Sequence, residues 1–194
     1  MNIVSDQIHA TFGSYVYVVL LFSDLSNVAI AGSVAVLFTV ANWPITIAAL
    51  GPLMLKLSAS HTRGALPYNT TPQHTAEAAR ILGPGKWLVA EQKVTLETDP
   101  AKARALGRKE LSRYMVLDNY RNNWLRIGFS EAELANGGSD RFIDAMVLWG
   151  TADKVRQGLR AHFDAGATHV CIQPVHEDGN TAARDRILTE LADT

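Results

Sequence analysis

Cysteine is almost absent from this chain: Cys171 is the single one among 194 residues. One cysteine excludes an intramolecular disulfide and fits a reducing compartment, so we expect a cytoplasmic protein. The first residues also lack the basic segment that opens a secretory signal. Hydrophobic residues make up 47% of the chain and charged residues 19%, which is typical of a globular protein with a sizeable core.

Charge is scarce in the first quarter of the chain, where the first basic residue is Lys56. The formal net charge of −1 argues against a nucleic-acid partner. Residues 28–47 carry no charge and are long enough to cross a bilayer, but Gly32, Asn42 and Pro44 interrupt them. We therefore favour buried strands or a core helix over a membrane span, and expect residues 14–42 to cover an edge or face of a sheet.

Several motifs that carry chemistry are missing. The six histidines include no pair at metal-ligand spacing on one expected element, so we expect no metal site. There is no Gly-x-Ser-x-Gly elbow and no glycine loop of the Walker type, so nucleophilic hydrolysis has no support. Cys171 lies within an apolar strand pattern, and we expect it to be buried rather than reactive.

The most informative segment present is a strand that runs directly into a helix. Ile45–Ala49 is apolar and rich in β-branched residues, and Pro52 suits the first position of a helix with Gly51 as its N-cap. A glycine N-cap leaves the amides of Gly51, Leu53 and Met54 without an internal acceptor, at the positive end of the helix dipole. These amides suit either a bound phosphate or water in an ordinary turn. Other helix starts offer side-chain caps, namely Thr71, Thr98-Asp99 and Thr151.

After Lys56 the chain alternates between strand and helix patterns, which predicts a parallel sheet under helices. The expected strands are Ile45–Ala49, Gly64–Tyr68, Glu91–Glu97 and Thr168–Gln173. The expected helices are Pro52–Ser60, Pro72–Leu82, Pro100–Leu117, Asp118–Ala135 with a break near Gly128, Arg141–Val147, Ala152–Ala165 with a stripe of Val155, Leu159 and Phe163, and a closing helix from about Thr181. Four such units make about half of a (β/α)8 barrel; a small doubly wound sheet is the alternative.

The placed segments resemble the carboxy-terminal half of the luciferase-like monooxygenase family, in its branch that uses the deazaflavin coenzyme F-420. The residues that carry this resemblance are Ile47-Ala-Ala-Leu-Gly-Pro-Leu-Met54, Gly64-Ala-Leu-Pro-Tyr68, Glu91-Gln-Lys-Val-Thr-Leu-Glu-Thr-Asp-Pro100, Asn119-Tyr-Arg-Asn-Asn-Trp124, Gly137-Gly-Ser-Asp140, Trp149-Gly150 and His169-Val-Cys-Ile-Gln173. We therefore divide the chain into an atypical apolar segment, residues 1–42, and the last four strand-helix units of a (β/α)8 TIM barrel, residues 43–194, in the α/β class.

The resemblance implies an oxidoreductase that performs hydride transfer or monooxygenation on a small organic substrate. It implies that F-420, or alternatively FMN, binds at the carboxyl ends of the strands, with Ala49, Leu50 and Gly51 near the cofactor and its phosphate at the amides of Leu53 and Met54. The family usually has lysine where this chain has Leu53, so an anion would depend on backbone amides. Residues 1–42 do not match the family's first half, where much of the pocket lies.

We therefore expect a truncated member that is weakly active or inactive by itself. The alternative is a non-catalytic remnant or interaction protein that pairs through the open edge of its sheet, for example as a homo-oligomer.

Two further residues are candidates for substrate contact. His176 follows the last strand, where a barrel places active-site side chains, although a surface position is the simpler interpretation. Arg141 follows Gly137-Gly-Ser-Asp140, which is either a mobile loop that presents an arginine to an anion or a turn that caps the next helix. Trp124 and Trp149 are expected in the core or an interface. Glu91 and Gln92 are expected to begin a strand, and we assign them no catalytic role.

Overall fold

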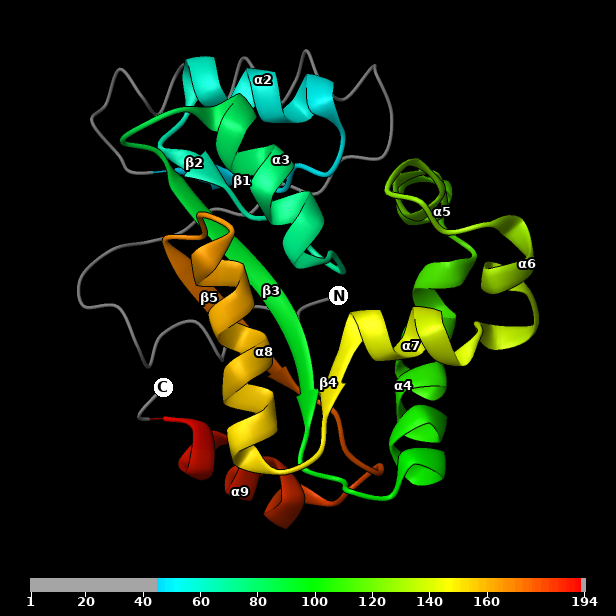
Figure 1. Ribbon diagram of the computed structural model, residues 1–194. Helices are drawn as coiled ribbons and strands as arrows, with labels where there is room; N and C mark the ends of the chain where they lie inside the picture. The colour runs from blue at the N-terminus through cyan, green and yellow to red at the C-terminus, as the bar shows by residue number, and fades with distance from the viewer. Residues whose placement is uncertain (1–44, 193–194) are drawn as a thin grey trace.

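A computed structural model describes residues 45–192, which form a parallel sheet covered by helices (Figure 1). The strands are β1 (Thr46–Ile47), β2 (Gly64–Ala65), β3 (Trp87–Thr95), β4 (Val147–Trp149) and β5 (His169–Pro174). The helices are α2 (Pro52–His61), α3 (Pro72–Leu82), α4 (Pro100–Met115), α5 (Asp118–Arg126), α6 (Glu131–Leu134), the 3-10 turn η2 (Ala135–Gly137), α7 (Asp140–Met146), α8 (Ala152–Asp164) and α9 (Thr181–Leu191). The expectations for residues 1–42 lie outside the described residues.

All strand pairs of the described sheet are parallel, in the order β1-β2-β3-β4 with β5 also on β3. The predicted parallel arrangement is therefore confirmed. The polypeptide returns through helices between successive strands, as parallel pairing requires. Within residues 45–192 no helix combines the length and the apolar character needed to cross a bilayer.

The long strand β3 organises the sheet because its two edges serve three neighbours. The odd-numbered residues of β3 make their backbone hydrogen bonds on the side of β2 and β4. The Trp87 and Glu91 amides donate to backbone carbonyls just before and just after β2. The Thr95 carbonyl accepts a hydrogen bond from the amide of the residue after β4. Even-numbered residues bond to β5, as the Val94 carbonyl does to Val175 N–H. Strands β2 and β4 consequently share one edge of β3, and β5 occupies the other.

Several boundaries differ from the sequence-based expectation, and two of them change how the sheet is built. β3 begins at Trp87 rather than Glu91, so Glu91 lies in the middle of a strand instead of at its start. The helix expected to reach Val147 ends at Met146, and Val147–Trp149 forms β4, which was not predicted. A strand of three residues is too short to show the alternation by which strands are recognised.

Three hydrophobic clusters hold the helices on the sheet. Helices α2 and α3 cover the first strands through one cluster (Ala49, Leu55, Ala65, Ala78, Leu82, Leu88). Helices α8 and α9 cover the end of β3 through another (Val94, Val155, Leu159, Ile187, Leu191). The third is rich in aromatic residues and lies mainly among α4, α5 and α7 (Leu111, Tyr120, Trp124, Phe129, Leu134, Phe142, Ile143, Met146, Val147, Val175). Trp124 is in the core, as expected, whereas Trp149 is half-buried.

The expected helix caps are present. Thr71, Asp99 and Thr151 each accept a hydrogen bond from an amide in the first turn of α3, α4 and α8. The expected apolar stripe of α8 is only partly correct, because Phe163 is 44% exposed. His162 takes the inward position instead.

His162 joins three elements inside the protein. Its Nδ1 lies 2.9 Å from Thr75 Oγ1 of α3, and its Nε2 lies 2.9 Å from Gln92 Oε1 of β3. Gln92 in turn donates to the carbonyl of Met146, the last residue of α7, at 3.0 Å. Burial lowers the pKa of His162 to about 4, so the ring is neutral at pH 7.

This buried histidine predicts acid sensitivity. The unfolded chain takes up a proton on His162 near pH 6.5, but the folded chain does so only near pH 4. The free energy of unfolding therefore falls as pH falls through this window, by about 3 kcal/mol in total from this residue. Urea unfolding at pH 7 and pH 4.5 measures the loss, and His162→Gln should reduce it. An equal pH dependence in wild type and variant would contradict the assignment.

Candidate functional site

The turn between β1 and α2 has the geometry predicted for it. Gly51 is the N-cap of α2 in an extended conformation, Pro52 is the first helical residue, and no side chain caps the helix. The first turn contains no acidic residue, and Leu53 is 61% exposed. Among residues 45–192, no atom lies within 4 Å of an ideal Cβ placed on Gly51. The amides of this first turn are therefore not blocked by a side-chain cap.

Two side chains fix the residue that precedes this N-cap. The Leu50 carbonyl accepts a hydrogen bond from His74 Nε2 at 2.7 Å and a longer one from Arg126 Nη2 at 3.4 Å. Burial lowers the pKa of His74, and the nearby Arg126 charge acts in the same direction. Helices α3 and α5 thus both hold the start of α2.

Unpaired polar atoms occur in α3 and α5, the two helices that hold this turn, and in the segment that precedes α3. Within the described residues, four buried side-chain atoms have no hydrogen-bond partner: Asn69 Nδ2, Thr70 Oγ1, His74 Nδ1 and Asn123 Nδ2. Asn69 and Thr70 lie in the segment between β2 and α3, His74 lies in α3, and Asn123 lies in α5. Native proteins pair nearly all buried polar groups with protein, water or ligand, so this region has unused hydrogen-bonding capacity.

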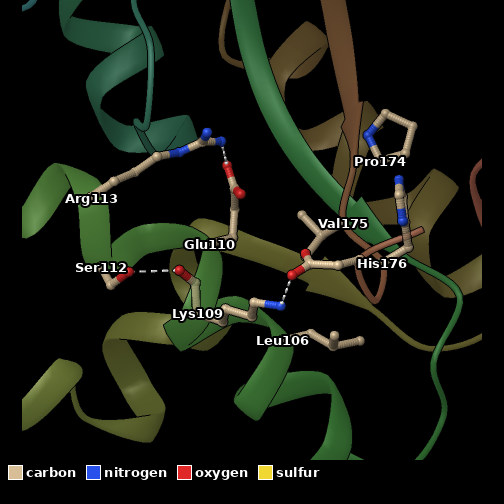
Figure 2. Close-up of a pocket in the computed structure, with 9 residues that line it drawn as sticks. Leu106, Lys109, Glu110, Ser112, Arg113, Pro174, Val175 and His176 are labelled. Carbon is tan, nitrogen blue, oxygen red and sulfur yellow. Dashed lines mark hydrogen bonds and ion pairs between the residues drawn. The ribbon is translucent and has the colours of Figure 1, made fainter. Parts of the chain in front are cut away.

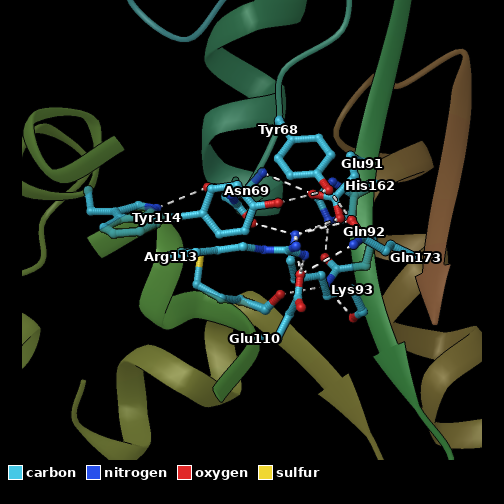
Figure 3. Close-up of polar contacts among 12 residues, drawn as sticks. Tyr68, Asn69, Glu91, Gln92, Lys93, Glu110, Arg113, Tyr114, His162 and Gln173 are labelled. Atoms are coloured by element: carbon cyan, nitrogen blue, oxygen red, sulfur yellow. Dashed lines mark hydrogen bonds and ion pairs between the residues drawn. The ribbon is translucent and has the colours of Figure 1, made fainter. Parts of the chain in front are cut away.

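A second polar group surrounds the buried Lys93 on β3 (Figure 3). Its ammonium donates to Asn69 Oδ1 at 2.6 Å, to Glu91 Oε1 at 3.0 Å and to Gln173 Oε1 at 3.4 Å. The rings of Tyr68 and Tyr114 lie 4.2 and 4.9 Å from Nζ. The Lys93 side chain is 0% exposed, and burial lowers the pKa of its amine, while the nearby Glu91 carboxylate opposes this shift. The contacts thus offset part of the cost of removing the charge from water.

The Lys93 group reaches α4 through Glu110. Glu110 Oε1 lies 4.0 Å from the Lys93 ammonium and accepts from Gln173 Nε2 at 3.3 Å. Arg113 pairs with the same carboxylate. Tyr68 donates to the Gln173 carboxamide, and burial raises the pKa of Tyr68, so its hydroxyl stays protonated. The group therefore ties together β3, β5, α4 and the loop after β2.

Sequence reasoning missed this group. It placed Glu91 at the beginning of a strand, whereas Glu91 and Lys93 lie two residues apart within β3 and so face the same side. Two opposite charges at that spacing, in a strand that is otherwise mostly apolar, were the available signal. Asn69 and Gln173, the partners from other elements, could not be identified from local pattern.

A cavity of about 330 Å³ lies beside this group, between α4 and the segment that follows β5 (Figure 2). Its lining includes two ion pairs, Glu110 with Arg113 and Lys109 with Asp178. Lys109 Nζ lies 2.6 Å from Asp178 Oδ2, and this contact lowers the pKa of Asp178. The remaining lining residues are Leu106, Ser112, Pro174, Val175 and His176.

The predicted site residues are therefore separated. His176 lines the cavity, whereas Ala49, Leu50, Gly51, Leu53 and Met54 do not. Arg141 pairs with Glu133 and lies 4.8 Å from the Phe129 ring, and Ser139 caps α7, so the Gly137–Asp140 segment is a capped turn. Cys171 is exposed, contrary to expectation, because β5 directs the alternate residues Val170 and Ile172 toward the cluster under α8 and α9. Residues 45–192 contain no cluster of three potential metal ligands.

The buried ion pair gives a test of stability. Lys93→Met leaves the Glu91 carboxylate buried without its cation, which should lower the free energy of unfolding by about 3–5 kcal/mol. The double variant Lys93→Met, Glu91→Gln should recover part of this loss, because no uncompensated charge remains. Denaturant unfolding of Lys93→Met, of Glu91→Gln and of the double variant gives a double-mutant cycle, which measures the interaction energy of the two side chains. Strictly additive losses would show that the two side chains do not interact.

Comparison with known proteins gives structural matches. No protein-family model matches the chain, and no curated protein matches it in sequence. An F-420-dependent secondary alcohol dehydrogenase in complex with an F-420-acetone adduct aligns with a TM-score of 0.53 and 15% identity, over 77% of this chain and 49% of that one. Ligand-free MsnO8 aligns with a TM-score of 0.52 and 18% identity, over 78% and 50%.

At such identities the likeness concerns the fold. The chain spans about half the length of these two structures. Its parallel sheet of alternating strand-helix units therefore matches half of a luciferase-like TIM barrel, which confirms the predicted fold class.

Proposed function

We propose that this chain binds the deazaflavin coenzyme F-420 through its phosphate at the start of α2, as part of an oxidoreductase site. The observation that carries the proposal is the uncapped first turn of α2, located at the carboxyl end of a parallel strand. Barrel and open α/β folds bind ligands at that end of the sheet, and helix N-termini bind phosphate. FMN, which also carries a phosphate, is the alternative ligand.

The residues of this turn fit a phosphate. Backbone amides of Gly51, Leu53 and Met54 supply donors, and the first turn holds no acidic side chain. No atom of the described part of the chain fills the space beside Gly51. Ala49 and Leu50 would lie next to the cofactor. When bound, the deazaflavin supplies hydride transfer to or from an organic substrate; the protein's part is to hold the cofactor, orient it and limit the access of water.

We assign the substrate to the cavity that His176 lines. The cavity beside His176 lies at the carboxyl end of β5, where a barrel presents its reactive rim. Its lining carries charges of both signs, so we propose a polar organic substrate there. Arg141 does not line this cavity and pairs with Glu133, so we assign it no part in the proposed site.

Catalysis by the chain in isolation should be slow. Hydride transfer needs cofactor and substrate held in one reactive geometry, and a displacement of about 1 Å can cost roughly a hundredfold in rate. The chain spans half of the structures it resembles. We therefore expect measurable cofactor binding but turnover below the range of about 1 to 1,000 per second that is ordinary for enzymes.

A second candidate function is an interaction protein without catalysis. In the described sheet β1 pairs only with β2, and β5 pairs only with β3, so both are edge strands. The edge of such a strand can pair with a strand of another chain. Light scattering of the purified protein, with and without cofactor, separates this function from the first: a defined oligomer without cofactor binding would favour it.

The phosphate site is tested by Gly51→Asp. An aspartate N-cap occupies the amides of α2, so it should stabilise the helix by a few tenths of a kcal/mol while excluding a phosphate by charge. We expect at least a tenfold loss of affinity for F-420 and for FMN, measured by calorimetric titration. The matched control is Leu117→Asp, at the start of α5, which also lacks a side-chain cap.

The affinities of these two variants for the cofactors can contradict the proposal. If Gly51→Asp binds either cofactor as tightly as Leu117→Asp does, the phosphate does not lie at α2. Reoxidation of reduced F-420 by the wild-type protein tests the expectation of slow turnover: a rate ordinary for enzymes would show that the reactive geometry is complete.

A further inference from the structure

The first turn of α2 carries no cation of its own, but one comes from another helix. Leu53 is the second residue of α2, and the segment preceding the helix is neutral. Arg126, the last residue of α5, approaches from α5 and contacts the Leu50 carbonyl at 3.4 Å. A positive charge thus reaches the residue before the N-cap from another helix, α5.

The contacts of Arg126 leave it able to bind a ligand. Its Nη2 donates to Asn123 Oδ1 at 2.9 Å, and its Nη1 lies 2.5 Å from Glu77 Oε2. The Arg126 side chain is 31% exposed, and partly exposed ion pairs of this kind contribute little to stability. A guanidinium has five N–H donors in a planar fork, and a phosphate can accept two of them at once.

Asn123 provides the second, independent observation. This side chain is 4% exposed, and its Oδ1 faces Arg126, which leaves the Nδ2 donor buried without a partner. The same Arg126 nitrogen bridges Asn123 and the residue before Gly51, so the carboxamide lies beside the start of α2. An unpaired buried donor next to a cation and to uncapped amides is the arrangement that an anion satisfies.

Arg126 is dispensable for holding the turn itself. The Leu50 carbonyl keeps its shorter hydrogen bond to His74 Nε2 at 2.7 Å when the arginine is removed. Loss of Arg126 should therefore change ligand binding more than folding, which makes the residue suitable for a test.

We infer that Arg126 and Asn123 of α5 complete an anion site with the uncapped amides of α2, and that this site recognises the phosphate of the cofactor. The inference rests on the function proposed above and adds to it the residues that neutralise the charge. Binding exchanges the Arg126–Glu77 ion pair for contacts with the phosphate, and Glu77 turns to solvent.

The experiment compares Arg126→Gln with Arg141→Gln. The two arginines are matched, because each lies on a helix and pairs with one glutamate. Inorganic phosphate, F-420 and FMN are titrated into the full chain by calorimetry, and thermal unfolding confirms that both variants are folded. We expect Arg126→Gln to weaken phosphate and cofactor at least tenfold, Arg126→Lys to weaken them less, and Arg141→Gln to match wild type.

Each result has a distinct meaning. Equal cofactor affinity in Arg126→Gln and Arg141→Gln overturns the inference, although binding by the wild type still supports the proposed function. If wild type binds phosphate but neither cofactor, and Arg126→Gln weakens phosphate, the anion site stands and the proposed function fails. If wild type binds none of the three, both fail.

Discussion

The buried contact between Lys93 and Glu91 is the interaction on which the rest of this structure depends. A charged amine without water must be surrounded by acceptors, and these come from the loop after β2, from β3 and from β5. The requirement fixes how those segments lie relative to one another at the carboxyl end of the sheet. It also fixes Asn69, which adopts a left-handed conformation and bonds to Glu91 and Trp124 through its backbone.

Through Asn69 the same constraint extends to the proposed phosphate site. Trp124, whose indole donates to the Asn69 carbonyl, is flanked on α5 by Asn123, and Arg126 follows one half-turn later. A single helix therefore contacts both the lysine-centred group and the start of α2. The orientation of α5 is set by packing in the aromatic cluster, where Trp124 and Phe142 have ring centroids 4.8 Å apart. Rigid packing behind a site is what keeps its donors in place.

Much of the fold was predictable because it depends on local signals. Side-chain caps, glycine and proline positions and strand-helix alternation located α2, α3, α8 and the parallel order of the strands. What failed was set by distant contacts. The partners of Lys93 lie 24 and 80 residues away in the sequence, the exposure of Cys171 depends on which face of β5 has neighbours, and Arg126 reaches α2 only after α5 has packed. No window of sequence contains that information.

The pairing of β3 with β5 also has a consequence for folding order. Val89 of β3 pairs with His169 of β5, eighty residues later in the chain. The ribosome must therefore synthesise the intervening helices, including α4, α5, α7 and α8, before β5 can pair with this edge of β3. Contacts so distant in sequence form late and slowly. During synthesis Lys93 can meet Asn69 and Glu91 early, but Gln173 only when the last strand emerges. The central strand is therefore the part of the nascent chain most dependent on protection until its final neighbour arrives.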